Sequence, residues 1–208
     1  MKRFFTSIPL QVGNGLAAVR YQAVDNKKLQ TDFDTCFPIL TAINGYVNAE
    51  EPFAVVSVIP DSGVGRENYR RLTEELAQLC GRKGLRTPEM VCVEYAEDMR
   101  VGAMTELFLK LSEQVKDDDE LYSCVTFGTK LVSTVMILAV QYGYQVRKNV
   151  TIDGIVYGEI SRPDPDPASW KARVYDETGL LQLEETARLL AQSGVRDPSA
   201  AIRGILNL

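Results

Sequence analysis

Residues 53–59 read Phe-Ala-Val-Val-Ser-Val-Ile and lie between Pro52 and Pro60. A continuous apolar run of this length, closed by proline at both ends, is typical of a strand that is covered on both faces. Such strands occur in mainly parallel sheets, because helices then pack against each face of the sheet. This stretch therefore indicates an α/β protein.

The segments on either side of this run alternate between strand and helix patterns. Strands are expected at 1–6, 16–24, 53–59, 90–95, 121–126 and 150–160, and helices at 34–48, 67–80, 101–115 and 130–144. The helix over 34–48 is expected to be capped by Asp32 or Asp34. This order predicts a Rossmann-like, mainly parallel sheet with helices on both faces.

The chain has 208 residues, which is enough for one main domain with an appendage. The Rossmann-like ligand-binding domain is expected over 1–160. A C-terminal extension over 161–208 then begins with the proline loop Arg-Pro-Asp-Pro-Asp-Pro at 162–167. This extension is expected to end in two short helices, at 180–193 and 198–206.

Several conspicuous residues are expected to be structural. Asp164 and Asp166 alternate with proline, so an exposed extended loop is favoured over a pair of metal ligands. Trp170 and Tyr175 are expected to pack the tail and not to stack on nucleic-acid bases. A helical stripe is expected to face the core, and it consists of Leu131, Val135, Leu138 and Tyr142.

The composition excludes several function classes. The net charge is −5, which argues against binding to duplex nucleic acid, since that affinity comes from arrays of Lys and Arg. The chain contains no histidine, so Ser-His-Asp and Cys-His catalysis, histidine-bound zinc and a histidine base are excluded. Any chemistry must therefore use Lys, Ser, Thr, Tyr or carboxylates, and neither a metal nor a cofactor is expected.

The cysteines and the N-terminus bear on the compartment. The four cysteines are widely spaced without a CxxC pair, and they are Cys36, Cys80, Cys92 and Cys124. Cys92 and Cys124 fall in strand patterns, so buried reduced thiols and a cytoplasmic protein are expected. The apolar run after Met1 is too short for a signal peptide or a membrane span, so no membrane association is expected.

In an open parallel sheet, ligands bind beyond the carboxyl ends of the strands. The loops expected at that edge are Thr6-Ser7-Ile8-Pro9, residues 61–66, residues 95–100 and residues 126–130. Candidate ligand-binding residues in the first two loops are Thr6, Ser7, Ile8, Asp61, Ser62, Gly63 and Arg66. In the last loop they are Thr126, Phe127, Gly128, Thr129 and Lys130.

The segment Cys124-Val-Thr-Phe-Gly-Thr-Lys130 is the most informative of these loops. Gly128 allows the backbone to come close to a ligand. Lys130 falls in the first turn of a helix, where the dipole disfavours a cation, so an anionic ligand would explain it. The alternative stays open that Thr126 or Thr129 caps the helix and Lys130 is simply exposed.

Two phosphate-binding motifs are excluded, and a third is left open. Gly13-Asn14-Gly15 begins a GxGxxA sequence, but a strand pattern follows it, whereas a dinucleotide site requires a helix. The order Gly-Thr-Lys at 128–130 lacks the glycine that a P-loop has directly before its lysine. Ser62-Gly-Val-Gly-Arg66 is either an anion-binding turn or an ordinary glycine-rich start of a helix.

The segment 124–130, the apolar helix after it and residues 149–158 (Asn-Val-Thr-Ile-Asp-Gly-Ile-Val-Tyr-Gly) together resemble the CARF, or CRISPR-associated Rossmann fold, domains of type III CRISPR systems. Many of those domains carry a D-x-T-H-G-F-R motif and a V-x-x-I-x-Y-G strand. Thr126, Gly128 and Lys130 stand at the T, G and R positions. Cys124 and Phe127 depart from the motif, at its Asp and His positions.

This resemblance implies a homodimer that binds a cyclic oligoadenylate across its two-fold axis. Some members cleave the messenger without a metal, when the ribose 2′-OH attacks the neighbouring phosphate and leaves a 2′,3′-cyclic phosphate. The implied catalytic residues are Ser7, which would orient the 2′-OH or the phosphate, and Lys130, which would stabilise the developing charge. A fused HEPN ribonuclease is excluded, because its motif requires a histidine.

Several functions remain open at this point. The chain could be a ring nuclease, a regulator that only binds the messenger, or a sensor whose effector is a separate protein. A Rossmann-like module that binds another small nucleotide, or a protein-interaction subunit, is the competing class.

Overall fold

The computed structural model describes residues 1–164, 166 and 169–206. Pro165 and Pro167, which belong to the proline loop expected at 162–167, lie outside the described residues. The chain divides into two compact units, Met1–Asp176 and Glu177–Leu208.

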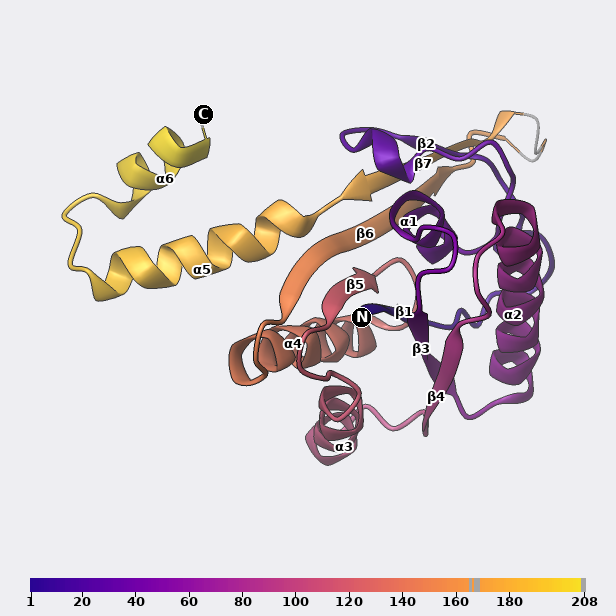
Figure 1. The fold of residues 1–208 in the computed structure, drawn as a ribbon, viewed down its shortest axis with the longest axis horizontal. Helices are drawn as coiled ribbons and strands as arrows, with labels where there is room; N and C mark the ends of the chain where they lie inside the picture. Colours follow the sequence, from indigo (N-terminus) through magenta and orange to yellow (C-terminus); the bar gives the residue numbers. More distant parts are fainter. Residues whose placement is uncertain (165, 167–168, 207–208) are drawn as a thin grey trace. The chain divides into compact units, whose positions relative to one another are not determined.

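The first unit is built on a seven-stranded sheet in the order β2-β7-β6-β5-β1-β3-β4 (Figure 1). Its strands are β1 (Lys2–Ser7), β2 (Tyr21–Ala23), β3 (Phe53–Pro60), β4 (Glu89–Tyr95), β5 (Glu120–Cys124), β6 (Thr151–Ser161) and β7 (Lys171–Asp176). Neighbouring strands run parallel except for β6 and β7, which are antiparallel. The predicted class, an α/β fold of Rossmann-like type, is confirmed.

Helices cover both faces of this sheet and create two cores (Figure 1). They are α1 (Ile39–Tyr46), α2 (Gly63–Lys83), α3 (Val101–Ser112) and α4 (Lys130–Val146). Phe4 and Val55 join the core under α1 and α2, whereas Phe5 and Val56 join the core under α3 and α4. Because successive strand residues point to opposite faces, a strand with helices on both sides is expected to be apolar, as residues 53–59 are apart from buried Ser57.

The helix expected over 34–48 is shorter than its pattern. It begins at Ile39 and has Pro38 at its N-cap, so the prediction that Asp32 or Asp34 caps it is wrong. A proline sterically disfavours the helical conformation of the residue directly before it. In addition, the Thr35 backbone pairs with Val19 through two hydrogen bonds of 3.0 and 3.1 Å, which keeps this segment extended.

The strand expected over 16–24 is also shorter in the structure than its pattern. A short 3-10 helix, η1 (Gly13–Leu16), precedes it, and the strand β2 keeps three residues, Tyr21–Ala23. β2 lies at the edge of the sheet, where a strand has one neighbour and gains less from lengthening.

The strand pattern did not predict β7. It pairs antiparallel with β6, and its buried residues Ala172 and Val174 alternate with exposed Lys171 and Arg173. This alternation is the normal sign of a strand with one face in water. The first compact unit consequently continues to Asp176, beyond the boundary expected after residue 160.

Two burial predictions are wrong in part. In the predicted stripe of α4, Val135 is buried, but Leu131, Leu138 and Tyr142 are 48%, 49% and 46% exposed, and residues such as Met136 fill the core instead. The stripe was misjudged because most positions of α4 are apolar, so spacing could not identify the buried face. Cys92 is exposed, because β4 is the outermost strand of the sheet.

The second unit consists of α5 (Thr178–Gln192) and α6 (Pro198–Leu206), close to the two short helices that were predicted. The two helices contact each other, and α5 has no fully buried residue. In the part of the chain that the structure describes, no helix is long and apolar enough to cross a membrane.

Candidate functional site

The carboxyl ends of β1, β3, β4 and β5 form one edge of the sheet, because these strands are parallel neighbours. β1 lies between β3 and β5, so the loops after residues 7, 60 and 124 lie next to each other. The structure therefore brings together the three loops that hold the predicted site residues.

The loops after β1 and β5 are in direct contact. The Ser7 hydroxyl donates a hydrogen bond to the backbone carbonyl of Phe127. Gly128 has a φ of +91°, and a Cβ at that position would lie 2.8 Å from the Ser7 Oγ. The left-handed backbone and the close approach both favour glycine, so Ser7 and Gly128 fix the path of the loop.

Three predicted ligand-binding residues are interior. Thr6, Ser7 and Ile8 each have about 1% of their surface exposed, and the Ile8 amide donates to the Val58 carbonyl at 2.8 Å. Their side chains therefore support the edge of the sheet from within.

The Thr126 side chain joins β5 to β6. Its hydroxyl accepts a hydrogen bond from the Gly158 amide at 2.7 Å and lies 3.2 Å from the Cys124 sulfur. Burial raises the pKa of the Cys124 thiol, so it remains a neutral packing group at the end of β5. Thr126 thus holds the start of the loop against β6.

Thr129 and Lys130 begin α4. Thr129 is the N-cap, and its hydroxyl accepts from the Val132 amide at 3.3 Å. This geometry matches the alternative left open above, in which Thr129 caps the helix. Lys130 is exposed, and it takes part in none of the ion pairs formed by the described residues. A cation in the first turn opposes the helix dipole, so the Lys130 ammonium remains available to an anion.

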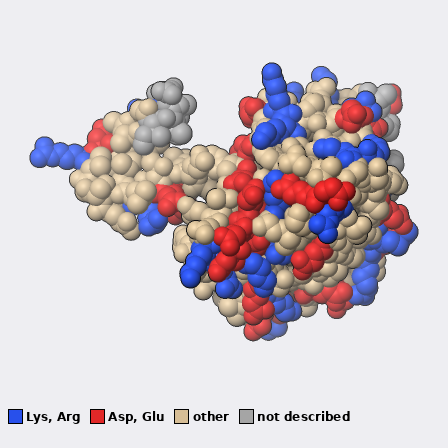
Figure 2. All heavy atoms as spheres, in the orientation of Figure 1, with Lys and Arg blue, Asp and Glu red and all other residues tan. Residues whose placement is uncertain are grey.

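The cations of the neighbouring loops are already paired. The Arg66 guanidinium lies 2.8 Å from the Asp61 carboxylate, and the Arg100 guanidinium lies 2.6 Å from the Asp98 carboxylate. Arg100 holds the pKa of Asp98 below its usual range. Both pairs are exposed, so solvent screens them strongly. Figure 2 likewise shows acidic and basic side chains interspersed over the visible face of the first unit.

Residues 62 and 63 form the start of α2. Ser62 is the N-cap of α2, and its hydroxyl accepts from the Gly65 amide at 3.0 Å. Gly63 is the first residue of the helix, with open space where a Cβ would lie. This geometry matches the ordinary glycine-rich helix start that was one of the two alternatives.

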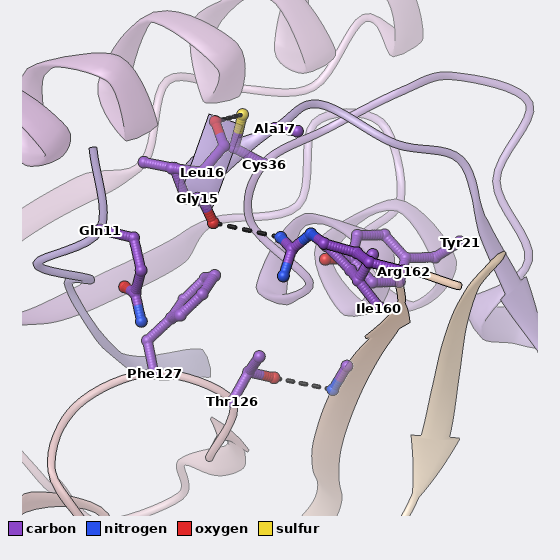
Figure 3. Close-up of a pocket in the computed structure, with 11 residues that line it drawn as sticks. Gln11, Gly15, Leu16, Ala17, Tyr21, Cys36, Thr126, Phe127, Ile160 and Arg162 are labelled. Atoms are coloured by element: carbon purple, nitrogen blue, oxygen red, sulfur yellow. Dashed lines mark hydrogen bonds between the residues drawn. The ribbon is translucent and has the colours of Figure 1, made fainter. Parts of the chain in front are cut away.

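A cavity of about 220 Å³ adjoins the same β5 loop (Figure 3). Thr126 and Phe127 line it, together with residues that sequence reasoning missed, namely Gln11, Tyr21 and Arg162. Tyr21 belongs to β2, and Arg162 lies in the segment after β6. The sequence pattern did not predict that these two segments would lie at this edge. The available signal was that Arg162 directly follows a strand whose carboxyl end points the same way as β5.

Comparison with models of known protein families gave no match to this chain, and a search of curated proteins gave none either. The function must therefore be argued from the residues at this edge of the sheet.

Proposed function

We propose that this chain is a sensor of the CRISPR-associated Rossmann fold type, which binds a cyclic oligoadenylate at the edge formed by Ser7, Gly128 and Lys130. The observation that carries the proposal is Lys130, an exposed ammonium with no ion pair among the described residues, at the N-terminus of a 17-residue helix. The Lys130 ammonium and those amides of the first turn of α4 that Thr129 does not cap suit a phosphodiester.

The exposed stripe of α4 supports a homodimer. Leu131, Leu138 and Tyr142 are about half exposed, and the sequence holds no charged residue between Leu131 and Val146. A charge-free helical face of this kind is unusual next to water and is typical of the core of an interface. Because Lys130 begins the same helix, a second copy on this stripe would bring a second Lys130 to the ligand.

The state of Ser7 favours binding over cleavage. Its hydroxyl is buried and donates to the Phe127 carbonyl, so it acts on the loop and does not face a ligand. A ring nuclease would need a group that contacts the ribose 2′-OH or the leaving 5′ oxygen. We therefore propose Ser7 as a positioning residue and the protein as a module that binds the messenger intact.

Calorimetric titration with cyclic tetra-adenylate and cyclic hexa-adenylate tests the proposal. We expect wild-type protein to bind one ring per two chains and Lys130→Ala to lose about 10- to 100-fold in affinity, as for a charge-assisted hydrogen bond. Lys148→Ala, which removes an exposed lysine at the amino end of β6, is the matched control. Absence of binding to either ring would contradict the proposal.

The same samples distinguish a sensor from a ring nuclease. Chromatography after prolonged incubation should return the intact ring. Linear products that carry a 2′,3′-cyclic phosphate would show cleavage instead, and Ser7→Ala would then report whether Ser7 contributes to it. Leu138→Glu should give a monomer in sedimentation and weaken binding if the α4 stripe is the interface.

A further inference from the structure

The cavity beside Phe127 holds an unsatisfied polar group. Tyr21 is fully buried, and its hydroxyl oxygen has no hydrogen-bond partner among the described residues. Burial raises the pKa of Tyr21 above its usual value, so the hydroxyl keeps its proton and can donate. A buried hydroxyl without a partner is costly. Tyr21 lines this cavity while its hydroxyl oxygen is covered, so a ligand supplies the missing partner when the lining side chains in front of the hydroxyl shift.

Two flat groups stand on opposite sides of this cavity. Figure 3 shows the Phe127 ring on one side, and Arg162 with Tyr21 behind it on the other. The Phe127 ring packs edge-on against Phe37, with ring centroids 6.4 Å apart. The Arg162 guanidinium lies 4.8 Å from the centre of the Trp170 ring and donates to the Gly15 carbonyl at 3.2 Å. Both groups are thus held in place by other residues.

Aromatic rings and guanidinium planes are the side-chain surfaces on which nucleobases stack. A cavity of about 220 Å³ is smaller than the roughly 300–1,000 Å³ of pockets for drug-sized ligands. It therefore suits a single heterocycle. The exposed amide of Gln11 adds both a donor and an acceptor at the rim.

The close packing around Tyr21 depends on Gly158. A Cβ at Gly158 would lie 2.4 Å from the Pro38 Cγ and 3.1 Å from the Tyr21 Cε1. Gly158 also donates a hydrogen bond to Thr126, so one residue holds both the wall of the cavity and the start of the β5 loop in place. A ligand that reaches both Lys130 and this cavity would therefore lie along the β5 loop.

We propose that this cavity is a nucleobase-binding subsite, in which the base stacks against Phe127 and Arg162 and its edge accepts a hydrogen bond from Tyr21. The identification of the base as adenine rests on the proposed function, whereas the subsite itself rests on the cavity. The phosphate of the same nucleotide would then lie toward Lys130.

Ligand-observed NMR with adenosine, which carries no phosphate, tests the subsite separately from Lys130. We expect wild-type protein to bind adenosine and Tyr21→Phe to weaken that binding about 3- to 10-fold, the effect of one hydrogen bond. The same variant should raise the melting temperature of the free protein, because it removes a buried hydroxyl without a partner. Tyr175→Phe, at a hydroxyl that donates to Glu159 at 3.0 Å, is the matched control.

Two further variants separate stacking from charge. Phe127→Leu should weaken adenosine binding by removing the stacking surface, and Lys130→Ala should leave adenosine binding unchanged. Titration of the Tyr21→Phe and Phe127→Leu proteins with cyclic tetra-adenylate then shows whether the ring uses the same subsite.

The outcomes distinguish this inference from the proposed function. If the wild type binds a cyclic oligoadenylate while Tyr21→Phe and Phe127→Leu leave that affinity and adenosine binding unchanged, the subsite is overturned and the proposed function stands. If the wild type binds adenosine through Tyr21 but binds no cyclic oligoadenylate, the subsite stands and the proposed function fails. Failure to bind either ligand overturns both.

Discussion

The two ends of strands β1 and β5 carry their charges in opposite ways. At the amino ends, the Arg3 guanidinium lies 2.7 Å from the Asp119 carboxylate, and the two side chains are only 3% and 2% exposed. At the carboxyl ends, Lys130 is exposed and takes part in no ion pair of the described residues. The charges at the amino end are therefore paired inside the protein, whereas the Lys130 charge at the carboxyl end is exposed and in no ion pair of the described residues.

Under the proposed function, this difference would separate residues that stabilise the fold from a residue that binds the ligand, along one pair of strands. Asp119 also accepts from the Lys116 amide at 2.8 Å and lies 3.5 Å from the N-terminal ammonium. All of these contacts would be lost if the Asp119 carboxylate were removed. At the carboxyl end, by contrast, the contacts that matter for the fold involve hydroxyls and a glycine, and not the lysine.

Removal of Asp119 should have the largest effect. Asp119→Ala leaves the Arg3 charge buried without its partner, and we expect a loss of about 3–5 kcal/mol in the free energy of unfolding. Urea denaturation measures it. Lys130→Ala is the comparison at the other end, where a change within about 0.5 kcal/mol is expected. Equal losses in the two variants would remove the distinction between the ends.

Gly128→Ala should have the next largest effect. The substitution forces a side chain onto a backbone with φ of +91° and brings a Cβ to 2.8 Å from the Ser7 Oγ. We expect a loss of about 1–3 kcal/mol in the free energy of unfolding. Gly63→Ala is the matched control, because a Cβ there meets nothing within 4 Å. If both substitutions were equally mild, the Ser7 contact would not determine the loop.

The smallest expected effect is a difference in the rates at which the cysteines react with a thiol reagent. These rates test how rigid the carboxyl end of the sheet is. Burial and then the Glu75 carboxylate raise the pKa of Cys36 to about 12, and burial raises that of Cys124. At pH 8 these thiols remain protonated, and labelling requires the thiolate. A disulfide reagent should therefore modify exposed Cys92 quickly and the buried cysteines slowly.

The labelled peptide, identified by mass spectrometry, decides this prediction. Rapid labelling of Cys124 would mean that the end of β5 opens readily, and that the carboxyl edge is less rigid than the contacts of Thr126 imply. Cys92→Ser should abolish the fast phase without changing the rate at the other three cysteines.

Much of the fold could be predicted because the apolar patterns are strong. The run 53–59 is buried at every position, as a strand between two helical layers must be. Prediction failed where the local pattern was ambiguous or where partners come from distant residues. In α4 the apolar residues surround the helix, so the sequence could not tell the buried face from the exposed one.

The candidate site was predicted in part, for the same reason. The order of strands and helices sends the loops after β1, β3 and β5 to one edge, so Ser7 and the 126–130 loop could be named in advance. Whether a side chain there faces solvent depends on contacts with other loops. Ser7 is turned toward the Phe127 carbonyl, and Arg66 is paired with Asp61.

The sequence by itself determined the α/β class, the absence of histidine chemistry and the glycine and lysine at 128 and 130, because these follow from composition and from local periodicity. The tertiary structure alone decided that Lys130 forms no ion pair with the other described residues, that Ser7 is buried and that Tyr21, Phe127 and Arg162 line one cavity. The reason is physical, since pairing, burial and cavities are set by residues that are far apart in the chain and meet when the sheet forms.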